Sequence, residues 1–131
     1  MNYKHPLLAS LILLSLLANI GCAAALLAGG AAAGAGSYAF ITGELKATED
    51  VSLDRAYQST QQAMKDLEFT ITSKQKDALY GEVIARRASG EKVAVKLNKK
   101  SNSLTEIKIR VGTFGDESVS RQIHETIKKH L

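Results

Sequence analysis

The stretch TEIKIRVGTFGDESVSRQIHETIKKHL, residues 105–131, changes from one hydrophobic period to another and decides the fold class. In residues 105–111, apolar and polar side chains alternate, which is typical of a strand with one buried face. From residue 116 onward, Val119, Ile123, Ile127 and Leu131 recur at helical spacing. A one-sided strand followed by a one-sided helix predicts a layered fold in which the helix covers the sheet.

The segments upstream complete this pattern. Alternation recurs near residues 69–73, 81–86 and 92–97, and residues 51–68 place their apolar side chains on one helical face behind Ser52, a good N-cap. Residues 38–48 supply one further strand. We therefore predict an α+β two-layer sandwich with the element order β-α-β-β-β-β-α, an antiparallel sheet of four to five strands, and two helices on one face.

Charge divides the chain into two parts. Residues 6–43 contain no charged residue, whereas every acidic residue lies between Glu44 and Leu131. The net charge of +4 is too small to imply a polyanionic partner by itself. We expect a signal segment (1–21), an Ala/Gly-rich tether (22–37) and one small folded domain (38–131).

The N-terminal segment ends at the only cysteine of the chain. An apolar run over residues 7–18 has the length of a signal-peptide core, and Gly21 places a small residue directly before Cys22. This arrangement resembles a bacterial lipoprotein signal, although Asn19 and Ile20 depart from its usual pattern. The resemblance implies cleavage between Gly21 and Cys22 and acylation of Cys22, so that membrane lipid is the first expected partner.

Two alternatives remain open for this segment. The first is an uncut anchor in which residues 7–27 make one transmembrane helix, and the second is a secretory peptide cut among the alanines after Cys22. We favour lipidation of Cys22 over these two alternatives, because two or more acyl chains hold a protein stably on a bilayer. A lone cysteine also excludes an internal disulfide.

The segment after Cys22 consists of small residues. We interpret this segment as a flexible spacer. Gly30 and Gly34 have the spacing that lets membrane helices approach closely, so self-association is the alternative. A phosphate-binding loop is excluded because no Gly-Lys-Ser/Thr follows.

Several short motifs resemble one bacterial family. They are GELK (43–46), SLD (52–54), KDAL (76–79) and IRVGTFGDESVSRQI (109–123), together with the Gly21-Cys22 signal end. The chain resembles the family called domain of unknown function 3568, and the resemblance covers nearly all of it. It implies a small bacterial lipoprotein without an assigned activity.

The polar face of the predicted sheet is the one patch with binding potential. It carries Lys92, Lys96, Lys108 and Arg110, with Arg86 as a further member. Contact with anionic headgroups or cell-wall polymers is one interpretation, and cross-strand pairing with Glu82 and Glu106 is the other. Nucleic acid is not expected, because no exposed aromatic residues interleave the lysines.

Residues for catalysis or metal binding are not evident. His124 and His130 lie six positions apart, too far round a helix for joint metal ligation. The acidic pairs Glu49-Asp50 and Asp116-Glu117 are expected at helix starts, where carboxylates cap and complement the dipole. We expect no enzyme, no metal and no cofactor.

The glycine-containing segment GTFGDES, residues 112–118, has two interpretations. Its backbone amides resemble an anion-binding nest, but Asp116 and Glu117 would repel an anion there. We predict a tight, self-capped turn into the last helix, with Phe114 in the core.

These patterns predict an envelope lipoprotein that makes structural or protein contacts, with an envelope protein or the cell wall as partner. Ala23, in place of aspartate, favours the outer membrane over the inner one. The alternative is a periplasmic binding module for a small anionic or lipidic ligand, with a pocket between helices and sheet. Its predicted lining is Tyr57, Tyr80 and Phe114.

Overall fold

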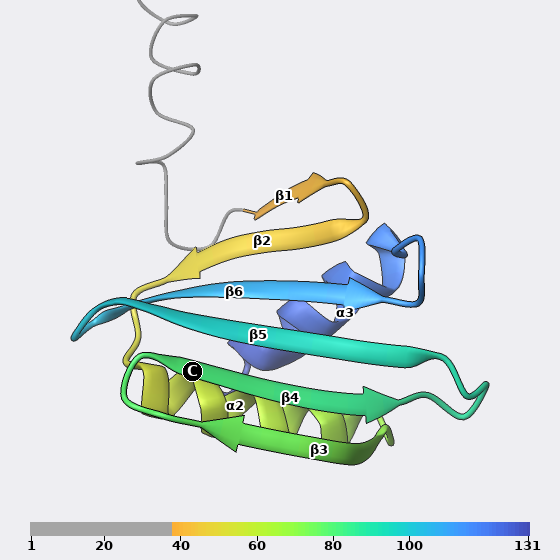
Figure 1. The fold of residues 1–131 in the computed structure, drawn as a ribbon, viewed down its shortest axis with the longest axis horizontal. Helices are drawn as coiled ribbons and strands as arrows, with labels where there is room; N and C mark the ends of the chain where they lie inside the picture. Colours follow the sequence, from red (N-terminus) through yellow and green to blue (C-terminus); the bar gives the residue numbers. More distant parts are fainter. Residues whose placement is uncertain (1–37) are drawn as a thin grey trace, which may run out of the picture. The chain divides into compact units, whose positions relative to one another are not determined.

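The computed structural model describes residues 38–131, which form one sheet and two helices (Figure 1). The predictions at Gly21, Cys22, Gly30 and Gly34 lie outside the described residues. The strands and helices in chain order are β1 (Tyr38–Ile41), β2 (Glu44–Glu49), α2 (Leu53–Asp66), β3 (Thr70–Lys76), β4 (Tyr80–Arg86), β5 (Lys92–Ser101), β6 (Leu104–Val111) and α3 (Glu117–Lys128).

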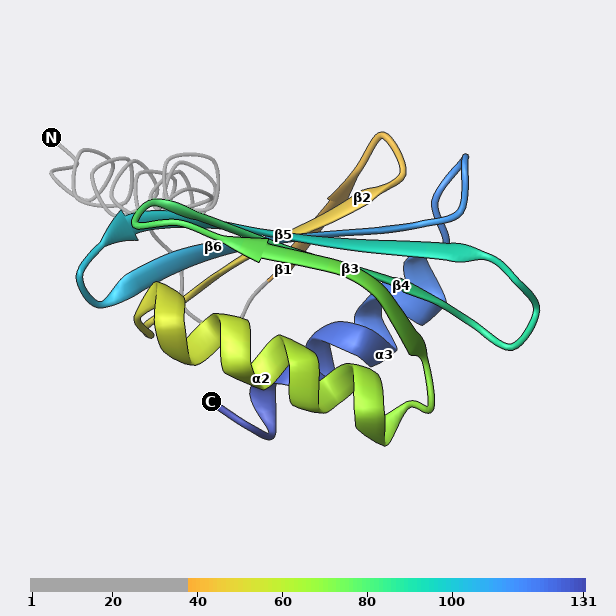
Figure 2. The same ribbon diagram turned by 60° about the horizontal axis from the view of Figure 1, so that its bottom comes forward.

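The sheet has six strands in the order β1-β2-β6-β5-β4-β3, and every neighbouring pair is antiparallel. Strands β3 to β6 form the predicted meander, and β2 lies beside β6. Both helices cover the same face of the sheet, so that the opposite face has no covering layer (Figure 2). The predicted α+β class and its two layers are confirmed.

The structure has six strands, whereas the prediction had four to five. Residues 38–48, expected as a single strand, form the β1–β2 hairpin because Thr42 and Gly43 both adopt positive φ, at 54° and 78°. This conformation reverses the chain direction within two residues. The additional strand β1 places Tyr38 and Phe40 against the core.

Helix α2 begins as predicted. The Ser52 hydroxyl accepts a hydrogen bond from the Arg55 amide at 3.3 Å, which satisfies one of the free amides of the first turn. The buried residues of α2 follow the predicted stripe, and Asp54 lies in the first turn. The helix therefore presents one apolar face to the sheet.

Helix α3 is also capped as predicted. The Asp116 carboxylate accepts a hydrogen bond from the Val119 amide at 3.0 Å, and Glu117 lies in the first turn. Ile123 and Ile127 are fully buried against the sheet.

The hydrophobic core lies between the two layers. Alternate residues of the four central strands meet the helix stripes there, as the period-two pattern requires. The buried hydrophobic residues are Leu45, Ala47, Leu53, Ala56, Ala63, Met64, Val83, Ala85, Val93, Val95, Leu97, Ile107, Ile109, Val111, Ile123 and Ile127.

Two predictions about individual side chains are wrong. Phe114 is 91% exposed rather than in the core, because the β6–α3 loop approaches the β1–β2 hairpin through its backbone: a Cβ atom on Gly115 would lie 2.1 Å from the carbonyl oxygen of Gly43. Glu49 does not cap a helix. It ends β2, is 6% exposed, and contacts His124 inside the protein.

None of the helices within residues 38–131 combines the length and apolar character needed to span a bilayer.

Candidate functional site

The candidate site is the sheet face that the helices leave uncovered, here called the open face. Strand alternation turns every second side chain of β2, β6, β5 and β4 toward it, because the intervening residues are buried under the helices. All of the basic residues predicted for this face lie on it. Its charged side chains are Glu44, Lys46, Glu82, Arg86, Lys92, Lys96, Lys100, Glu106, Lys108 and Arg110.

Three lysines form a continuous row across the open face. Lys46 on β2 is the register partner of Lys108 on β6, which is in turn the register partner of Lys96 on β5. Direct cross-strand neighbours have Cβ atoms about 5 Å apart, and like charges in such positions destabilise a sheet. We call these residues the lysine row. The row brings together residues that are far apart in the sequence.

The lysine row is only partly neutralised by carboxylates. The Lys46 ammonium lies 4.0 Å from a Glu44 oxygen, and the Lys108 ammonium lies 3.6 Å from a Glu106 oxygen. Lys96 makes no ion pair with any residue between 38 and 131, although Glu82 is its register partner on β4. The Glu82 carboxylate instead accepts a hydrogen bond from Gln75 at 3.0 Å.

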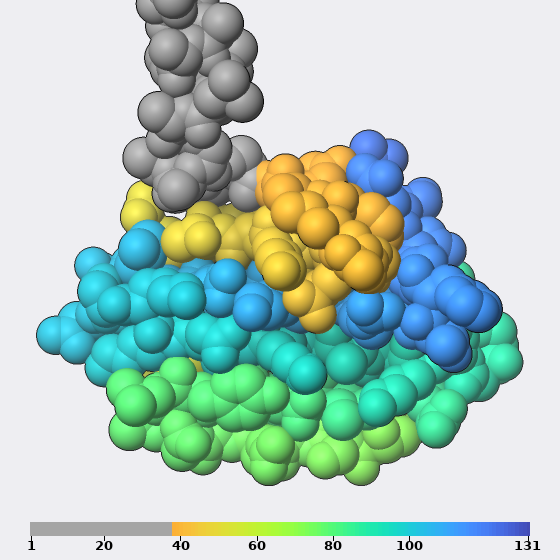
Figure 3. Space-filling view, turned by 45° about the horizontal axis from the view of Figure 1, so that its top comes forward, coloured from red at the N-terminus to blue at the C-terminus, as the bar shows by residue number. Residues whose placement is uncertain are grey.

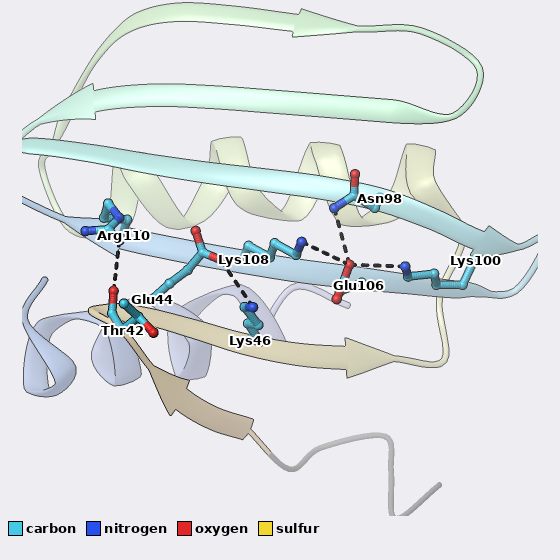
Figure 4. Close-up of polar contacts among 8 residues, drawn as sticks. All are labelled: Thr42, Glu44, Lys46, Asn98, Lys100, Glu106, Lys108 and Arg110. Carbon is cyan, nitrogen blue, oxygen red and sulfur yellow. Dashed lines mark hydrogen bonds and ion pairs between the residues drawn. The ribbon is translucent and has the colours of Figure 1, made fainter. Parts of the chain in front are cut away.

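Glu106 is the main acidic group beside the row (Figure 4). The same oxygen lies 3.3 Å from the Lys100 ammonium, 3.6 Å from that of Lys108, and 3.3 Å from the Asn98 amide nitrogen. One carboxylate is thus shared between two lysines. The cross-strand contact to Glu106 comes from Lys100 on β5, whereas Lys108 contacts it along the same strand, so the predicted cross-strand pairing does not include Lys108. The positive charges of the open face still exceed the negative ones.

Arg110 joins two loops at one end of the open face. Its guanidinium donates to the Thr42 carbonyl at 2.9 Å, as Figure 4 shows, and to the Thr113 carbonyl at 3.0 Å. These acceptors are uncharged backbone oxygens, so the contacts hold the guanidinium in place without neutralising it. Arg110 therefore has both a structural role and an available charge.

The two loops that Arg110 joins also touch through their glycines. Gly43 and Gly115 have positive φ of 78° and 84°, and a Cβ on Gly43 would lie 2.3 Å from the Phe114 carbonyl oxygen. Only glycine fits both the dihedral angles and the close approach. Figure 3 shows the β1–β2 hairpin and the β6–α3 segment next to each other at this end of the molecule.

The open face is hollowed beside these loops, with a volume of about 800 Å³. This volume falls in the range of small-ligand sites. Its charged and aromatic lining consists of Glu44, Glu82, Arg86, Glu91, Lys92, Lys96, Lys108, Arg110, Phe114 and Asp116.

The acids that line the hollow have partners of their own. Asp116 caps α3, Glu91 pairs with Arg87 at 2.5 Å, and the Glu44 carboxylate lies near Lys46. Lys92, like Lys96, makes no ion pair within the described part of the chain, and Arg86 donates to the Gly90 carbonyl at 2.7 Å. Glu82 and Asp116 have only uncharged partners, so the lining, with five basic and four acidic side chains, keeps an excess of one positive charge.

Apolar side chains protrude at the same end. Phe114, in the β6–α3 loop, is 91% exposed, and Ile41, the last residue of β1 before the turn that Arg110 contacts, is 54% exposed. Leu79, which is 67% exposed, lies in the β3–β4 turn at the opposite end of the sheet.

Sequence analysis missed Lys46 and the exposure of Phe114. Lys46 could have been found from the sequence, because it alternates with the apolar residues Leu45 and Ala47.

The structure does not form the pocket predicted from Tyr57, Tyr80 and Phe114. Tyr57 packs over Gly81 between α2 and the sheet, where a Cβ on Gly81 would lie 3.2 Å from the tyrosine ring. Tyr80 is the register partner of Asn98 and lies on the opposite, open side. Burial, together with the nearby Glu82 carboxylate, raises the pKa of Tyr80. Tyr57 thus lies on the helix side of the sheet, whereas Tyr80 and Phe114 lie at opposite ends of the open face.

The two histidines of the domain lie in different environments. His124 is fully buried with Nε2 2.7 Å from Glu49, whereas His130 contacts Asp66 near the surface. The contact with His130 lowers the pKa of Asp66. No group of three or more potential metal-ligating side chains occurs within residues 38–131.

Comparison with known proteins identifies the family. Residues 6–130 match the family described as "Protein of unknown function (DUF3568)". The chain belongs to this family. The resemblance seen in the sequence motifs is therefore confirmed, and membership of the family assigns no activity. No curated protein matches the chain.

Proposed function

We propose that this member of the DUF3568 family is a bacterial envelope lipoprotein whose folded domain binds an anionic partner on its open face. Acylated Cys22 would anchor the chain, residues 23–37 would act as the tether, and residues 38–131 would face the periplasm. The signal-like N-terminus supports the anchoring, and Ala23 favours the outer membrane. The function is one of binding rather than of catalysis.

The observation that carries the binding proposal is the lysine row. Three ammonium groups stand on adjacent strands, and Lys96 has no counterion within the described residues. A face that served only solubility would alternate its charges, because opposite charges across strands stabilise a sheet and like charges destabilise it. An anion that contacts the row removes this repulsion, so the arrangement favours bound anion over empty surface.

The hollow supports the same proposal. It offers about 800 Å³ beside the row, and Arg110 is held at its edge by two backbone carbonyls. A guanidinium that is already positioned loses little conformational entropy when an anion binds. The open face therefore favours the binding-module interpretation over a purely structural role.

Binding on the open face is tested with tripolyphosphate, a soluble probe that carries several negative charges. Added to the purified full chain in neutral detergent, it should raise the melting temperature, because a ligand that binds only the folded state stabilises it. The double variant Lys96→Gln/Lys108→Gln should lose most of this rise. The matched control Lys65→Gln/Lys129→Gln removes the same charge from exposed positions on the helical side. An equal loss in both variants would contradict the proposal.

The anchor is tested separately by the intact mass of the protein isolated from membranes. Loss of residues 1–21 with added acyl mass supports lipidation at Cys22. A free, alkylatable thiol on Cys22, or an intact Met1 terminus, would overturn it.

A further inference from the structure

We propose that the partner of the open face is the surface of an anionic lipid bilayer, and that Phe114 inserts into it. This inference rests on the proposed function, because it names the anionic partner. It adds a second membrane contact, made by the folded domain itself, to the lipid anchor expected at Cys22.

The first argument is the position of the exposed apolar side chains. Single exposed hydrophobic residues are common on protein surfaces. Phe114 in the β6–α3 loop and Ile41 at the end of β1, however, are 91% and 54% exposed at the same end of the sheet, and Phe114 lines the hollow. An exposed aromatic ring at the edge of a face with excess positive charge matches the bilayer interface, where apolar chains lie directly beneath charged headgroups.

The second argument is the rigidity of the loop that carries Phe114. Gly43 and Gly115 pack backbone against backbone, and Arg110 donates to both loops. The ring is therefore presented on a fixed support, and insertion needs no ordering of the loop. A loop built only to connect β6 with α3 would not require an exposed phenylalanine.

The third argument is charge complementarity. Lys92, Lys96, Lys108 and Arg110 share one side of the sheet, and Lys92 and Lys96 have no ion pair within residues 38–131. Each cation close to an anionic membrane strengthens binding by about fivefold. A soluble polyanion would use the same cations, but it would leave Phe114 and Ile41 in water. The bilayer accounts for both the charges and the apolar side chains.

The tether permits this arrangement. Residues 23–37 reach about 50 Å when fully extended, so a domain anchored at Cys22 stays close enough to contact the same bilayer. The local concentration of headgroups is then high, and even a weak contact is populated.

The chain contains no tryptophan, so Phe114→Trp creates a single fluorescent reporter at the proposed insertion site. Leu79→Trp is the matched control, because Leu79 is also exposed but lies at the opposite end of the sheet. Each full-chain variant is reconstituted into vesicles of phosphatidylcholine alone, or of phosphatidylcholine mixed with phosphatidylglycerol. Urea unfolding confirms that both variants remain folded.

We expect the emission of Trp at position 114 to shift to shorter wavelength only in the vesicles with phosphatidylglycerol, and brominated lipid to quench it. The shift should disappear when Lys96→Gln/Lys108→Gln is added, while the Leu79→Trp control stays water-like in both vesicles. An unchanged emission at position 114, or equal shifts at both positions, would overturn the inference. If tripolyphosphate still protects the chain in that case, the open face binds a soluble polyanion and only the membrane inference fails.

Discussion

His124 and Glu49 form a buried pair that joins α3 to the end of β2. The imidazole Nε2 lies 2.7 Å from the Glu49 carboxylate, and the two side chains are separated by 75 positions in the chain. His124 is fully buried, and its ring meets Tyr38 edge-on with centroids 6.3 Å apart. This pair therefore ties the first hairpin, the last helix and the core together.

Removing the Glu49 carboxylate should destabilise the folded protein. In Glu49→Ala the buried imidazole loses its partner, and its Nδ1 already has none within the described residues. Because an unpaired buried polar group keeps its desolvation penalty, we expect the free energy of unfolding to fall by about 3 kcal/mol. Urea unfolding measures this loss.

The variant Glu49→Gln is the matched control for that experiment. Glutamine keeps a hydrogen-bonding oxygen at the same place, so the loss should be near 1 kcal/mol. Equal stability of Glu49→Ala and the unaltered protein would show that the pair contributes nothing to the fold.

The contact between the two glycine loops gives a second prediction. Gly115→Ala places a Cβ 2.1 Å from the Gly43 carbonyl oxygen at a residue with φ of 84°, so the loops must separate. We expect a loss of about 3 kcal/mol in unfolding free energy, from strain and lost packing together. Gly90→Ala is the control, since its φ is 86° but no atom lies within 4 Å of the added Cβ.

For Gly90→Ala only the dihedral strain remains, and the loss should be about 1 kcal/mol. Urea unfolding of both variants separates dihedral strain from collision. If the two variants lost the same stability, the close approach of Gly43 and Gly115 would not matter energetically.

The lysine row predicts a mutation that stabilises the protein. Lys96→Gln removes one of two like charges that face each other across β5 and β6, whereas Glu82, the neighbour of Lys96 on β4, forms no ion pair with it and accepts a hydrogen bond from Gln75. At low salt the free energy of unfolding should rise by about 0.4 kcal/mol, and the gain should shrink as salt screens the repulsion. Lys65→Gln, at an exposed position on α2, should change stability by less than about 0.2 kcal/mol. A loss of stability in Lys96→Gln would mean that the ammonium is already satisfied.

The layers of the fold were predictable because each strand and helix buries only one face. Residues 105–111 alternate strictly between buried and partly exposed side chains, and α2 carries one apolar stripe. The hydrophobic period alone therefore identifies the first as a strand and the second as a helix. The β1–β2 hairpin was not predictable in this way, because its turn depends on positive φ at Thr42, a residue type that rarely adopts it.

The candidate site was predictable as a set of residues but not as an arrangement. Alternation placed Lys96, Lys108 and Arg110 on one face, whereas the lysine row depends on β2 pairing with β6, a contact between segments distant in sequence. Phe114 was misplaced because hydrophobicity favours burial, whereas the loop packs on the β1–β2 hairpin through the backbone of Gly115 and Gly43 and leaves the ring exposed.

Acid stability should depend on Asp77, which shapes the β3–β4 turn. Its carboxylate accepts hydrogen bonds from the Leu79 and Tyr80 amides, both at 2.8 Å, and these bonds, that from Leu79 first, lower its pKa below the ordinary value of 3.8. A pKa that is lower in the folded than in the unfolded state contributes stability above the unfolded value, and this contribution is lost as pH falls through the folded value. The variant Asp77→Asn tests this dependence, because it keeps an accepting oxygen but does not titrate.

We expect the unfolding free energy of Asp77→Asn to fall less steeply than that of the unaltered protein below about pH 4, as measured by urea unfolding across that range. Parallel curves for the two proteins would show that the turn does not distinguish the charged from the neutral carboxyl group.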